Sequence, residues 1–326
     1  MRLDYSRRKI SGMSRKAARR QTIIGAAMLL VLGAVTAHAD DAAPRQSLDD
    51  AWWTGPIIAN SPNALPPGHA YVESYAYDAR TAGANAFGSQ TFMLYGVTKR
   101  LTLGVIPAFG YDRLAGGAGS SRIGVGDITL HAQYQLTHFD PQDAKPAIAV
   151  AIEETLPTGK YDKLGRTSDG FGGGAYAAGL AIYAQDVFWL PNGRILRTRI
   201  NLSQLFPGRA RVDGPSVYGT NAGFDGRATP GAATSFDNAW EYSVTRRWVA
   251  AVDLYYHHAR RTRVDGAGPM GEVHLTNGPS DTFAIAPAVE YSWTSNLGVL
   301  FGTRFIVPGR NTHPSVTPVV ALSAFL

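Results

Sequence analysis

The chain has 326 residues, a formal net charge of +6 and no cysteine, which excludes disulfide bonds, cysteine-ligated metals and thiol catalysis. Eight of the 31 Lys and Arg residues but only one of the 25 Asp and Glu residues lie in residues 1–39, so the remaining chain is nearly neutral and its charge does not indicate nucleic-acid binding. Beyond residue 39 no uncharged apolar run reaches the roughly 20 residues that a membrane-spanning helix needs, which excludes a helical span there.

Residues 1–39 have the features of a secretory signal peptide. A basic stretch ends at Arg20, an apolar stretch covers residues 23–35, and the sequence Ala-His-Ala at residues 37–39 is an A-x-A cleavage site. A membrane anchor is the alternative, but the apolar stretch is too short to span a bilayer comfortably. We therefore expect a cleaved signal peptide and a mature chain that begins at Asp40.

Residues 40–67 form a proline-rich segment. It contains Trp52 and Trp53 and then the prolines at positions 56, 62, 66 and 67. Prolines at this density exclude a helix or a central strand, because proline has no backbone N–H to donate. The segment is therefore predicted to be irregular.

From Gly68 onward, apolar and polar residues alternate with a period of two, as they do in strands with one apolar and one polar face. The clearest example is residues 124–139, where Leu130 and Tyr134 belong to an apolar file and His131 and Gln133 to a polar one. Twelve such stretches are predicted as strands: residues 69–78, 89–98, 100–111, 123–138, 146–156, 174–188, 194–205, 237–246, 248–259, 282–293, 296–307 and 315–326.

The polar files of these strands carry charged residues and histidines: Glu73, Asp127, His131, Glu153, Arg197, Arg199, Glu241, Asp253, His257, Glu290 and Arg304. A sandwich core could not hold so many, because each isolated buried charge costs several kcal/mol. They would face water outside a sandwich, or line the wet lumen of a membrane barrel.

The connections between the strands distinguish these two settings. Short connections at residues 99–100, 140–143, 191–193, 247 and 295 alternate with long ones at 79–88, 112–122, 157–173, 206–236, 260–281 and 308–314. Outer-membrane barrels have an even number of strands, short periplasmic turns and longer external loops. The alternation therefore favours a barrel with both termini on the periplasmic side and with exposed external loops.

Aromatic residues also gather near the predicted strand ends, as in the interfacial girdles of membrane barrels. They are Tyr95, Tyr111, Tyr134, Trp189, Trp240, Trp248, Tyr291 and Trp293. Ordinary enrichment of aromatic residues in strands is an equal explanation, so this signal does not decide between the two folds.

Several short motifs together resemble a known family. They are Trp53-Thr54-Gly55-Pro56, Ser61-Pro62-Asn63, Pro67-Gly68-His69, Gly124-Val125-Gly126-Asp127-Ile128 and Leu156-Pro157-Thr158-Gly159. In these motifs the chain resembles the outer-membrane transporter family named for the MetA-pathway of phenol degradation. The resemblance covers most of the mature chain. It implies an outer-membrane barrel that passes small molecules, aromatic or otherwise hydrophobic.

No catalytic, cofactor-binding or metal-binding residues are predicted. His131 and His257 lie on polar files, where hydration of a lumen is favoured over metal or proton chemistry. Arg197, Arg199 and Arg304 together with the glutamates either produce a transverse field across a pore or form cross-strand ion pairs. The basic pair at residues 260–261, which follows two histidines, is a candidate contact for acidic lipopolysaccharide.

The sequence thus predicts an all-β fold: a transmembrane, antiparallel, up-and-down barrel of about twelve strands over residues 68–326, in the outer membrane of a Gram-negative bacterium. Residues 40–67 are expected to lie in the periplasm or in the lumen. The predicted function is a channel or transporter for small molecules that needs no cofactor. A structural or adhesive barrel and an outer-membrane lipid hydrolase are the alternatives. The expected partners are the bilayer, lipopolysaccharide, solutes and the barrel assembly machinery.

Overall fold

The structure, a computed structural model, describes residues 44–142 and 145–326. The predicted signal peptide lies outside the described residues. Two short 3-10 helices, η1 (Leu48–Asp50) and η2 (Thr167–Asp169), interrupt an otherwise all-β chain. Within the described ranges, no helix has the length and apolar character that crossing a membrane requires.

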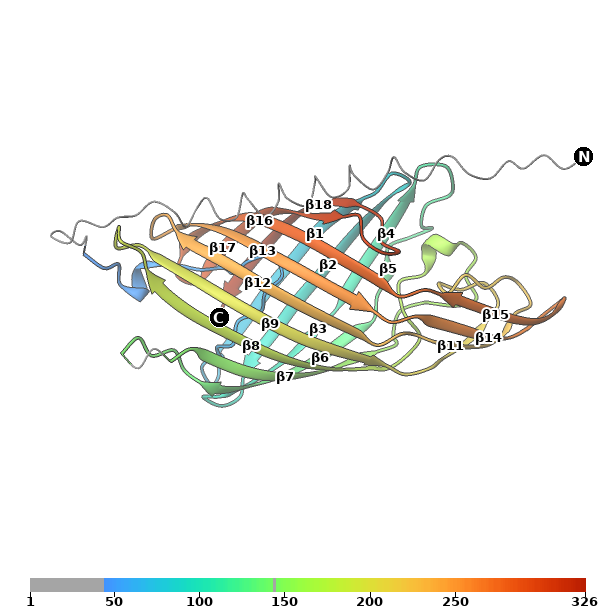
Figure 1. The fold of residues 1–326 in the computed structure, drawn as a ribbon, viewed down its shortest axis with the longest axis horizontal. Helices are drawn as coiled ribbons and strands as arrows, with labels where there is room; N and C mark the ends of the chain where they lie inside the picture. The colour runs from blue at the N-terminus through green and yellow to red at the C-terminus, as the bar shows by residue number, and fades with distance from the viewer. Residues whose placement is uncertain (1–43, 143–144) are drawn as a thin grey trace, which may run out of the picture. The chain divides into compact units, whose positions relative to one another are not determined.

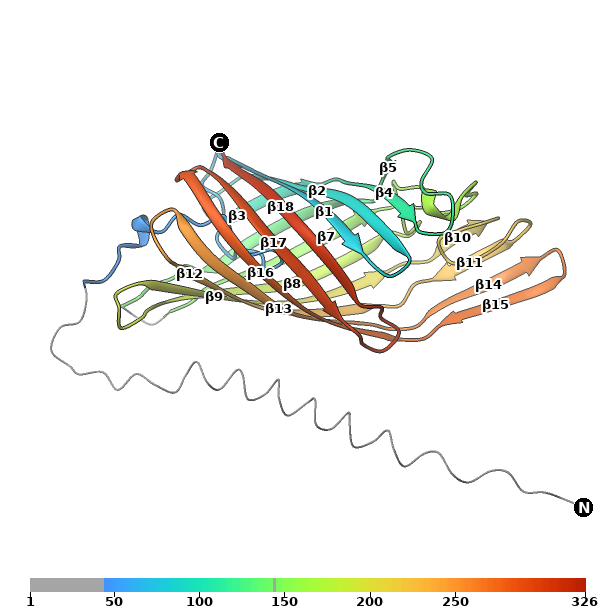
Figure 2. The ribbon, with the colours of Figure 1, turned by 90° about the horizontal axis from the view of Figure 1, so that it is seen from above.

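A closed antiparallel barrel forms the body of the protein (Figures 1 and 2). Its strands are β1 (Ala70–Arg80), β2 (Ala84–Gly96), β3 (Leu101–Ile106), β4 (Ala108–Leu114), β5 (Gly124–Val125), β6 (Ile128–Thr137), β7 (Ala147–Leu156), β8 (Ala177–Trp189), β9 (Ile195–Pro207), β12 (Ala233–Ser243), β13 (Trp248–Ala259), β16 (Ser280–Thr294), β17 (Leu297–Val307) and β18 (Ser315–Phe325). Pairing of β1 with both β2 and β18 closes the sheet.

These fourteen strands make twelve wall strands, because two wall strands are each broken into two parts. Pro107 separates β3 from β4, and both parts pair with β2. Residues 126–127 separate β5 from β6 in the same way. The predicted twelve-stranded antiparallel barrel is therefore confirmed, and the predicted bounds are mostly within a few residues of those observed.

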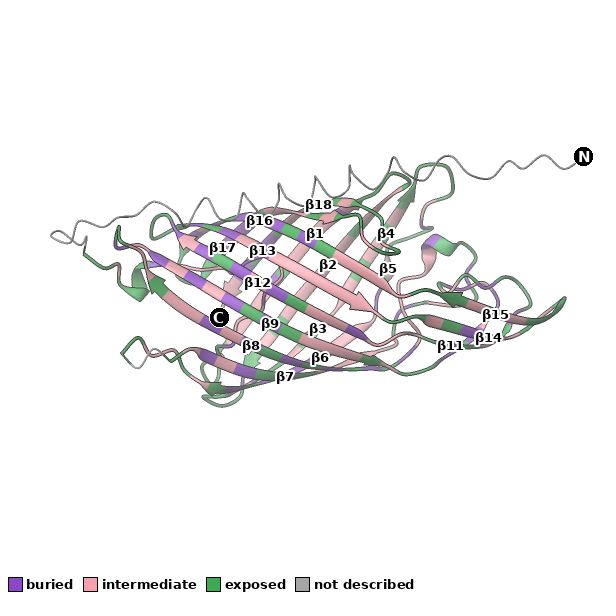
Figure 3. Cartoon of the chain, in the orientation of Figure 1, coloured by how far each residue is buried: buried purple, intermediate pink, exposed green. Residues whose placement is uncertain are grey.

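Exposed and buried side chains alternate along the wall strands (Figure 3). On β6, Leu130 and Tyr134 are exposed, whereas His131 and Gln133 are buried. This is the reverse of a soluble protein: the apolar file covers the outside of the barrel and the polar file covers its interior. Such an arrangement is stable when the outside contacts lipid and the interior supplies hydrogen-bond partners.

A second sheet of four strands continues the wall beyond the barrel at the end opposite to the C-terminus (Figure 1). It consists of β10 (Ala210–Asp213), β11 (Asp225–Thr229), β14 (Thr262–Gly268) and β15 (Gly271–Asn277). We call it the outer sheet. The connections 206–236 and 260–281, which were expected to be exposed loops, thus contain regular strands. Their sequences are short and rich in glycine and charge, so they lack the apolar alternation that marks the wall strands.

Candidate functional site: the barrel interior

The proline-rich chain before β1 runs inside the barrel; we call residues 52–66 the inner segment. One oxygen of Glu290 accepts hydrogen bonds from the two backbone N–H groups of residues 54–55, at 2.7 and 3.0 Å, and from the threonine hydroxyl at 3.0 Å. Asp253 accepts three more from the backbone N–H groups of residues 57–59, at 3.0, 3.3 and 3.1 Å. Two buried wall carboxylates therefore replace the backbone ladder that this irregular segment cannot form.

Uncharged wall side chains hold the later part of the inner segment. The backbone N–H of Ala64 donates to Oε1 of Gln135 at 2.9 Å, and that of Leu65 donates to the hydroxyl of Thr102 at 2.9 Å. The segment is thus fixed to β3 and β6 as well as to β13 and β16.

Gly298 on β17 makes room for the inner segment. A Cβ at this position would lie 2.2 Å from Cγ2 of Thr54, which no real contact allows. We expect Gly298→Ala to lower the free energy of unfolding by about 1–3 kcal/mol, as overpacked interiors do. Urea unfolding of the barrel in detergent, followed by tryptophan fluorescence, measures this change.

Thr54→Ser supplies the control, because it removes the clashing methyl group and keeps the hydroxyl that donates to Glu290. The double variant Gly298→Ala/Thr54→Ser should recover most of the lost free energy. Equal losses in the single and double variants would contradict this packing.

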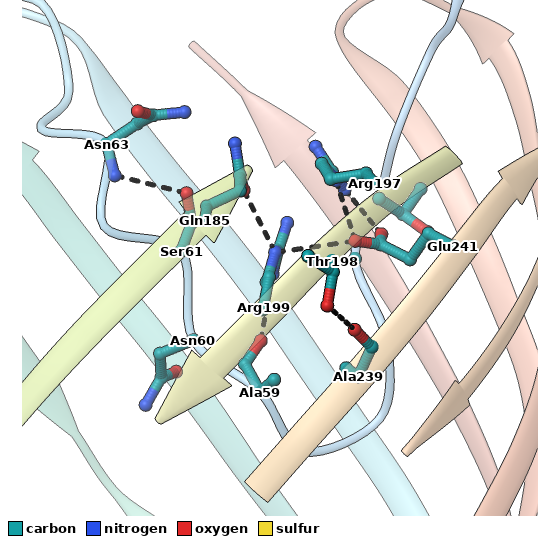
Figure 4. A network of polar contacts seen from close by, with 12 residues as sticks. Ala59, Asn60, Ser61, Asn63, Gln185, Arg197, Thr198, Arg199, Ala239 and Glu241 are labelled. Atoms are coloured by element: carbon teal, nitrogen blue, oxygen red, sulfur yellow. Dashed lines mark hydrogen bonds and ion pairs between the residues drawn. The ribbon is translucent and has the colours of Figure 1, made fainter. Parts of the chain in front are cut away.

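Two arginines and one glutamate form a buried charge cluster beside the inner segment (Figure 4). Both Nε and Nη2 of Arg197 bond to the carboxylate of Glu241, with Nε at 2.6 Å, and Nε of Arg199 lies 3.4 Å from the same carboxylate. Nη1 of Arg199 donates to the carbonyl oxygen of Ala59 at 2.8 Å, and the Arg197 guanidinium lies 4.2 Å from the centre of the Trp53 ring. One carboxylate thus serves two cations.

A cavity of about 380 Å³ lies between the inner segment and the wall. Besides residues of the inner segment, its lining includes Tyr71, Glu73, Tyr75, Phe92, Arg197 and Arg199. Aromatic faces and guanidinium groups therefore border one space, an arrangement suited to a molecule with both a ring and a negative or hydrogen-bonding group.

Other predicted site residues have partners outside the charge cluster, although one of them, His131, also lines the cavity. Nδ1 of His131 lies 3.0 Å from Oε1 of Glu153 on the neighbouring strand. Asp127 accepts hydrogen bonds from the backbone N–H groups of Gly159 and Gly173, at 2.9 and 2.7 Å. Asp127 therefore fixes both ends of the connection between β7 and β8 rather than contacting the cavity.

In the described part of the chain, neither His257 nor Arg304 forms a hydrogen bond or an ion pair with the charge cluster. Nδ1 of His257 lies 2.8 Å from the hydroxyl of Ser235, and Nε of Arg304 is buried without a protein hydrogen-bond partner. Across residues 44–142 and 145–326, no group of three or more His, Asp or Glu side chains is arranged to hold a metal ion.

Asp237 is a buried interior carboxylate that the sequence interpretation missed. It lies four residues before Glu241 on β12, so both side chains belong to the same file. That spacing was the available signal. Tyr71 and Tyr75, which line the cavity, were missed in the same way. Each lies two residues from Glu73 on β1 and therefore faces the same side of the strand.

Comparison with solved structures shows the fold. An outer membrane channel from Pseudomonas putida F1 is 15% identical; the match covers 83% of this chain and 100% of that one, with a TM-score of 0.60. The NanC porin is 9% identical over 78% of this chain and 98% of its own, with a TM-score of 0.45. The TodX deltaS2S3 mutant monoaromatic hydrocarbon channel is 13% identical over 80% and 91%, with a TM-score of 0.42.

Two comparisons at the level of sequence gave different results: one found no match and the other found a family. No curated protein matches the chain. The model of the family described as "Putative MetA-pathway of phenol degradation" matches residues 55–317, which include part of the inner segment and nearly the whole barrel. The chain is therefore an outer-membrane β-barrel that belongs to the MetA-pathway of phenol degradation family.

Proposed function

We propose that this chain is an outer-membrane channel for small amphiphilic molecules with an aromatic ring, and that the cavity beside the inner segment is its internal binding site. The observation that carries the proposal is the lining of this cavity, where Arg197 and Arg199 border the same space as aromatic side chains of β1 and β2. The name of the family, which refers to phenol degradation, points to the same class of solute.

The dimensions of the cavity support this solute class. An apolar cavity of roughly 150 Å³ is enough to hold benzene. A cavity of about 380 Å³ has room for one substituted ring and a few waters, but not for a folded peptide or an oligosaccharide. Guanidinium groups would orient a phenolate or carboxylate by charge-assisted hydrogen bonds. We also propose that the charged interior residues line a wet lumen and that solutes cross the membrane through it.

Single-channel conductance in planar bilayers tests the proposal. With the processed protein and simple salt, we expect stepwise currents that benzoate partly blocks. Arg199→Gln should weaken the benzoate block by about tenfold, since a hydrogen bond to a charged group contributes about 1.5–3 kcal/mol. The control is Arg304→Gln, an equal charge change in the interior but outside the cavity lining.

Two results would overturn the proposal. An inserted, folded protein that carries no current would exclude an open channel. Equal benzoate block in wild type and Arg199→Gln would exclude the cavity as the binding site.

One observation favours the second candidate function, a barrel that does not conduct at rest. The inner segment occupies the interior and is anchored there by buried carboxylates on β13 and β16. A silent wild type that conducts when residues 44–66 are removed would indicate a gated channel. A silent barrel in both forms would favour a structural or adhesive role.

The proposal also covers how the protein is exported and what surrounds it in the outer membrane. Residues 1–39 would be removed on export, and the barrel would be inserted by the barrel assembly machinery. Lipopolysaccharide is the proposed neighbour in the outer leaflet. Mass spectrometry of the protein purified from outer membranes would give the mature N-terminus, which we place at Asp40.

A further inference from the structure

The outer sheet has one apolar and one charged face, and the charged face carries Asp213, Asp225 and Asp265 as well as arginines. Val212, Ala228 and Val264 form a buried cluster on the apolar face. On the opposite face, Arg227 of β11 and Arg263 of β14 are both exposed. Thr229 pairs with Arg263 across these strands, so the exposed side chains come from neighbouring strands of one face.

A cavity of about 480 Å³ lies among these side chains. It is lined by Arg209, Gly226, Arg227, Thr229, Arg263 and Asp265. Three guanidinium groups and a hydroxyl group thus surround one space together with a single carboxylate.

The three arginines are available to bind an anion. In the part of the chain that the structure describes, none of Arg209, Arg227 and Arg263 lies within 4.0 Å of a carboxylate. The carboxylate of the lining, Asp265, is already paired with Nδ1 of His274 at 2.8 Å. The cavity therefore presents a surplus of positive charge with fork-shaped donors, the geometry that suits phosphate.

This charged face points away from the barrel axis. The apolar face of the outer sheet packs against Tyr161, which belongs to the connection between β7 and β8. The same connection carries Phe171, whose ring covers the interior side of Gly110 and Gly124. Because this connection reaches into the mouth of the barrel, the face that it covers looks inward and the arginine face looks outward.

The charged face also begins where the lipid-facing surface ends. On β9 the last exposed aromatic residue is Phe206, and Arg209 follows three residues later. At about 3.3 Å per residue, Arg209 lies roughly 10 Å beyond Phe206 along the chain. Phosphorylated headgroups of outer-leaflet glycolipids lie at this level, next to acyl chains that cover the apolar surface.

We propose that the cavity among Arg209, Arg227 and Arg263 on the outer sheet binds the phosphate groups of an anionic glycolipid of the outer leaflet. This site is separate from the channel interior and does not depend on the proposed solute. The glycolipid would contact both the arginines through its phosphates and Phe206 through its acyl chains. A soluble phosphate would use the arginines alone.

Native mass spectrometry of the delipidated, full processed protein tests the proposal, with bisphosphorylated lipid A as the probe. We expect Arg227→Gln/Arg263→Gln to weaken lipid A binding by at least about tenfold. The charge-matched control, Arg113→Gln/Arg122→Gln, changes two exposed arginines outside the cavity and should bind as wild type does. Unchanged conductance of the double variant would show that it still folds and inserts.

Further probes separate the possible sources of the anion. Lipid A without phosphates should bind at least about tenfold more weakly to wild type, and inorganic pyrophosphate should compete poorly with the intact lipid. Pyrophosphate binding as tight as that of lipid A would overturn the glycolipid assignment in favour of a free anion. Equal lipid A binding by wild type and Arg227→Gln/Arg263→Gln would overturn the site.

Discussion

Replacement of Glu241 by Gln should lower the free energy of unfolding by about 3–5 kcal/mol, a larger loss than the one expected for Gly298→Ala. Glu241 is fully buried, and its carboxylate is the shared partner of Arg197 and Arg199. The neutral amide would leave two buried guanidinium groups without the carboxylate that pairs with both, and desolvated charges of this kind are costly. Urea unfolding in detergent micelles, followed by tryptophan fluorescence, gives the change.

The matched control is Glu153→Gln, the same substitution at another interior carboxylate. Its side chain is 31% exposed and, among the described residues, has His131 as its one ion-pair partner, so the expected loss is below about 1 kcal/mol. Similar losses for the two variants would show that the charge cluster contributes no more to stability than an ordinary partly exposed pair.

Replacement of both Asp253 and Glu290 by Ala should release the inner segment from the wall. Together these carboxylates accept five backbone N–H groups, and hydrogen bonds to charged groups contribute about 1.5–3 kcal/mol each. Loss of both anchors should therefore raise the undocked fraction by at least about 100-fold. The chain has no cysteine, so Ala59→Cys provides a single buried reporter for a water-soluble maleimide.

We expect the labelling rate of this reporter to rise by at least about 100-fold in the Asp253→Ala/Glu290→Ala background. The control background is Asp237→Ala, which removes a buried interior carboxylate that makes no hydrogen bond to the inner segment. A rate that stays at the wild-type value, or one that rises equally in the control, would contradict the anchoring role of the two carboxylates.

The barrel wall could be predicted from the sequence because membrane strands have two chemically opposite faces. The stretch predicted at residues 248–259 coincides with β13 (Trp248–Ala259), and that at 146–156 nearly coincides with β7 (Ala147–Leu156). In both, an apolar file that contacts lipid alternates with a file that contacts the interior. Contact with lipid on one side and with the polar interior on the other requires apolar and polar residues to alternate along the whole strand.

The outer sheet could not be predicted in this way. Its strands are as short as the four residues of β10, and β14 reads Thr-Arg-Val-Asp-Gly-Ala-Gly. Only Val264 of β14 is buried, because both faces of this sheet lie outside the lipid. Without a second apolar position the alternation gives no signal. These strands exist because β9, β12, β13 and β16 already lie side by side and continue past the barrel.

The site was only partly predictable. Alternation indicated that Asp253, Glu290 and Arg199 belong to the polar file, but not that they bind the backbone of residues 54–59. Backbone N–H groups carry no sequence signature, and the contact between Thr54 and Glu290 joins residues 236 positions apart. The polar side chains and the inner segment come together only when the barrel closes. No local sequence pattern encodes that closure.

The sequence separation of these contacts also sets the order in which the molecule can be assembled. The inner segment precedes all the wall strands in the chain, yet its anchors lie on β13 and β16, near the end of the chain. Contacts between distant positions carry a large loop-closure entropy and form slowly. Docking of the inner segment therefore has to wait until β13 and β16 are in place. No ladder of the wall includes the inner segment, so the seam can close before the interior is filled. The newly inserted barrel would then pass through a stage that is open from end to end.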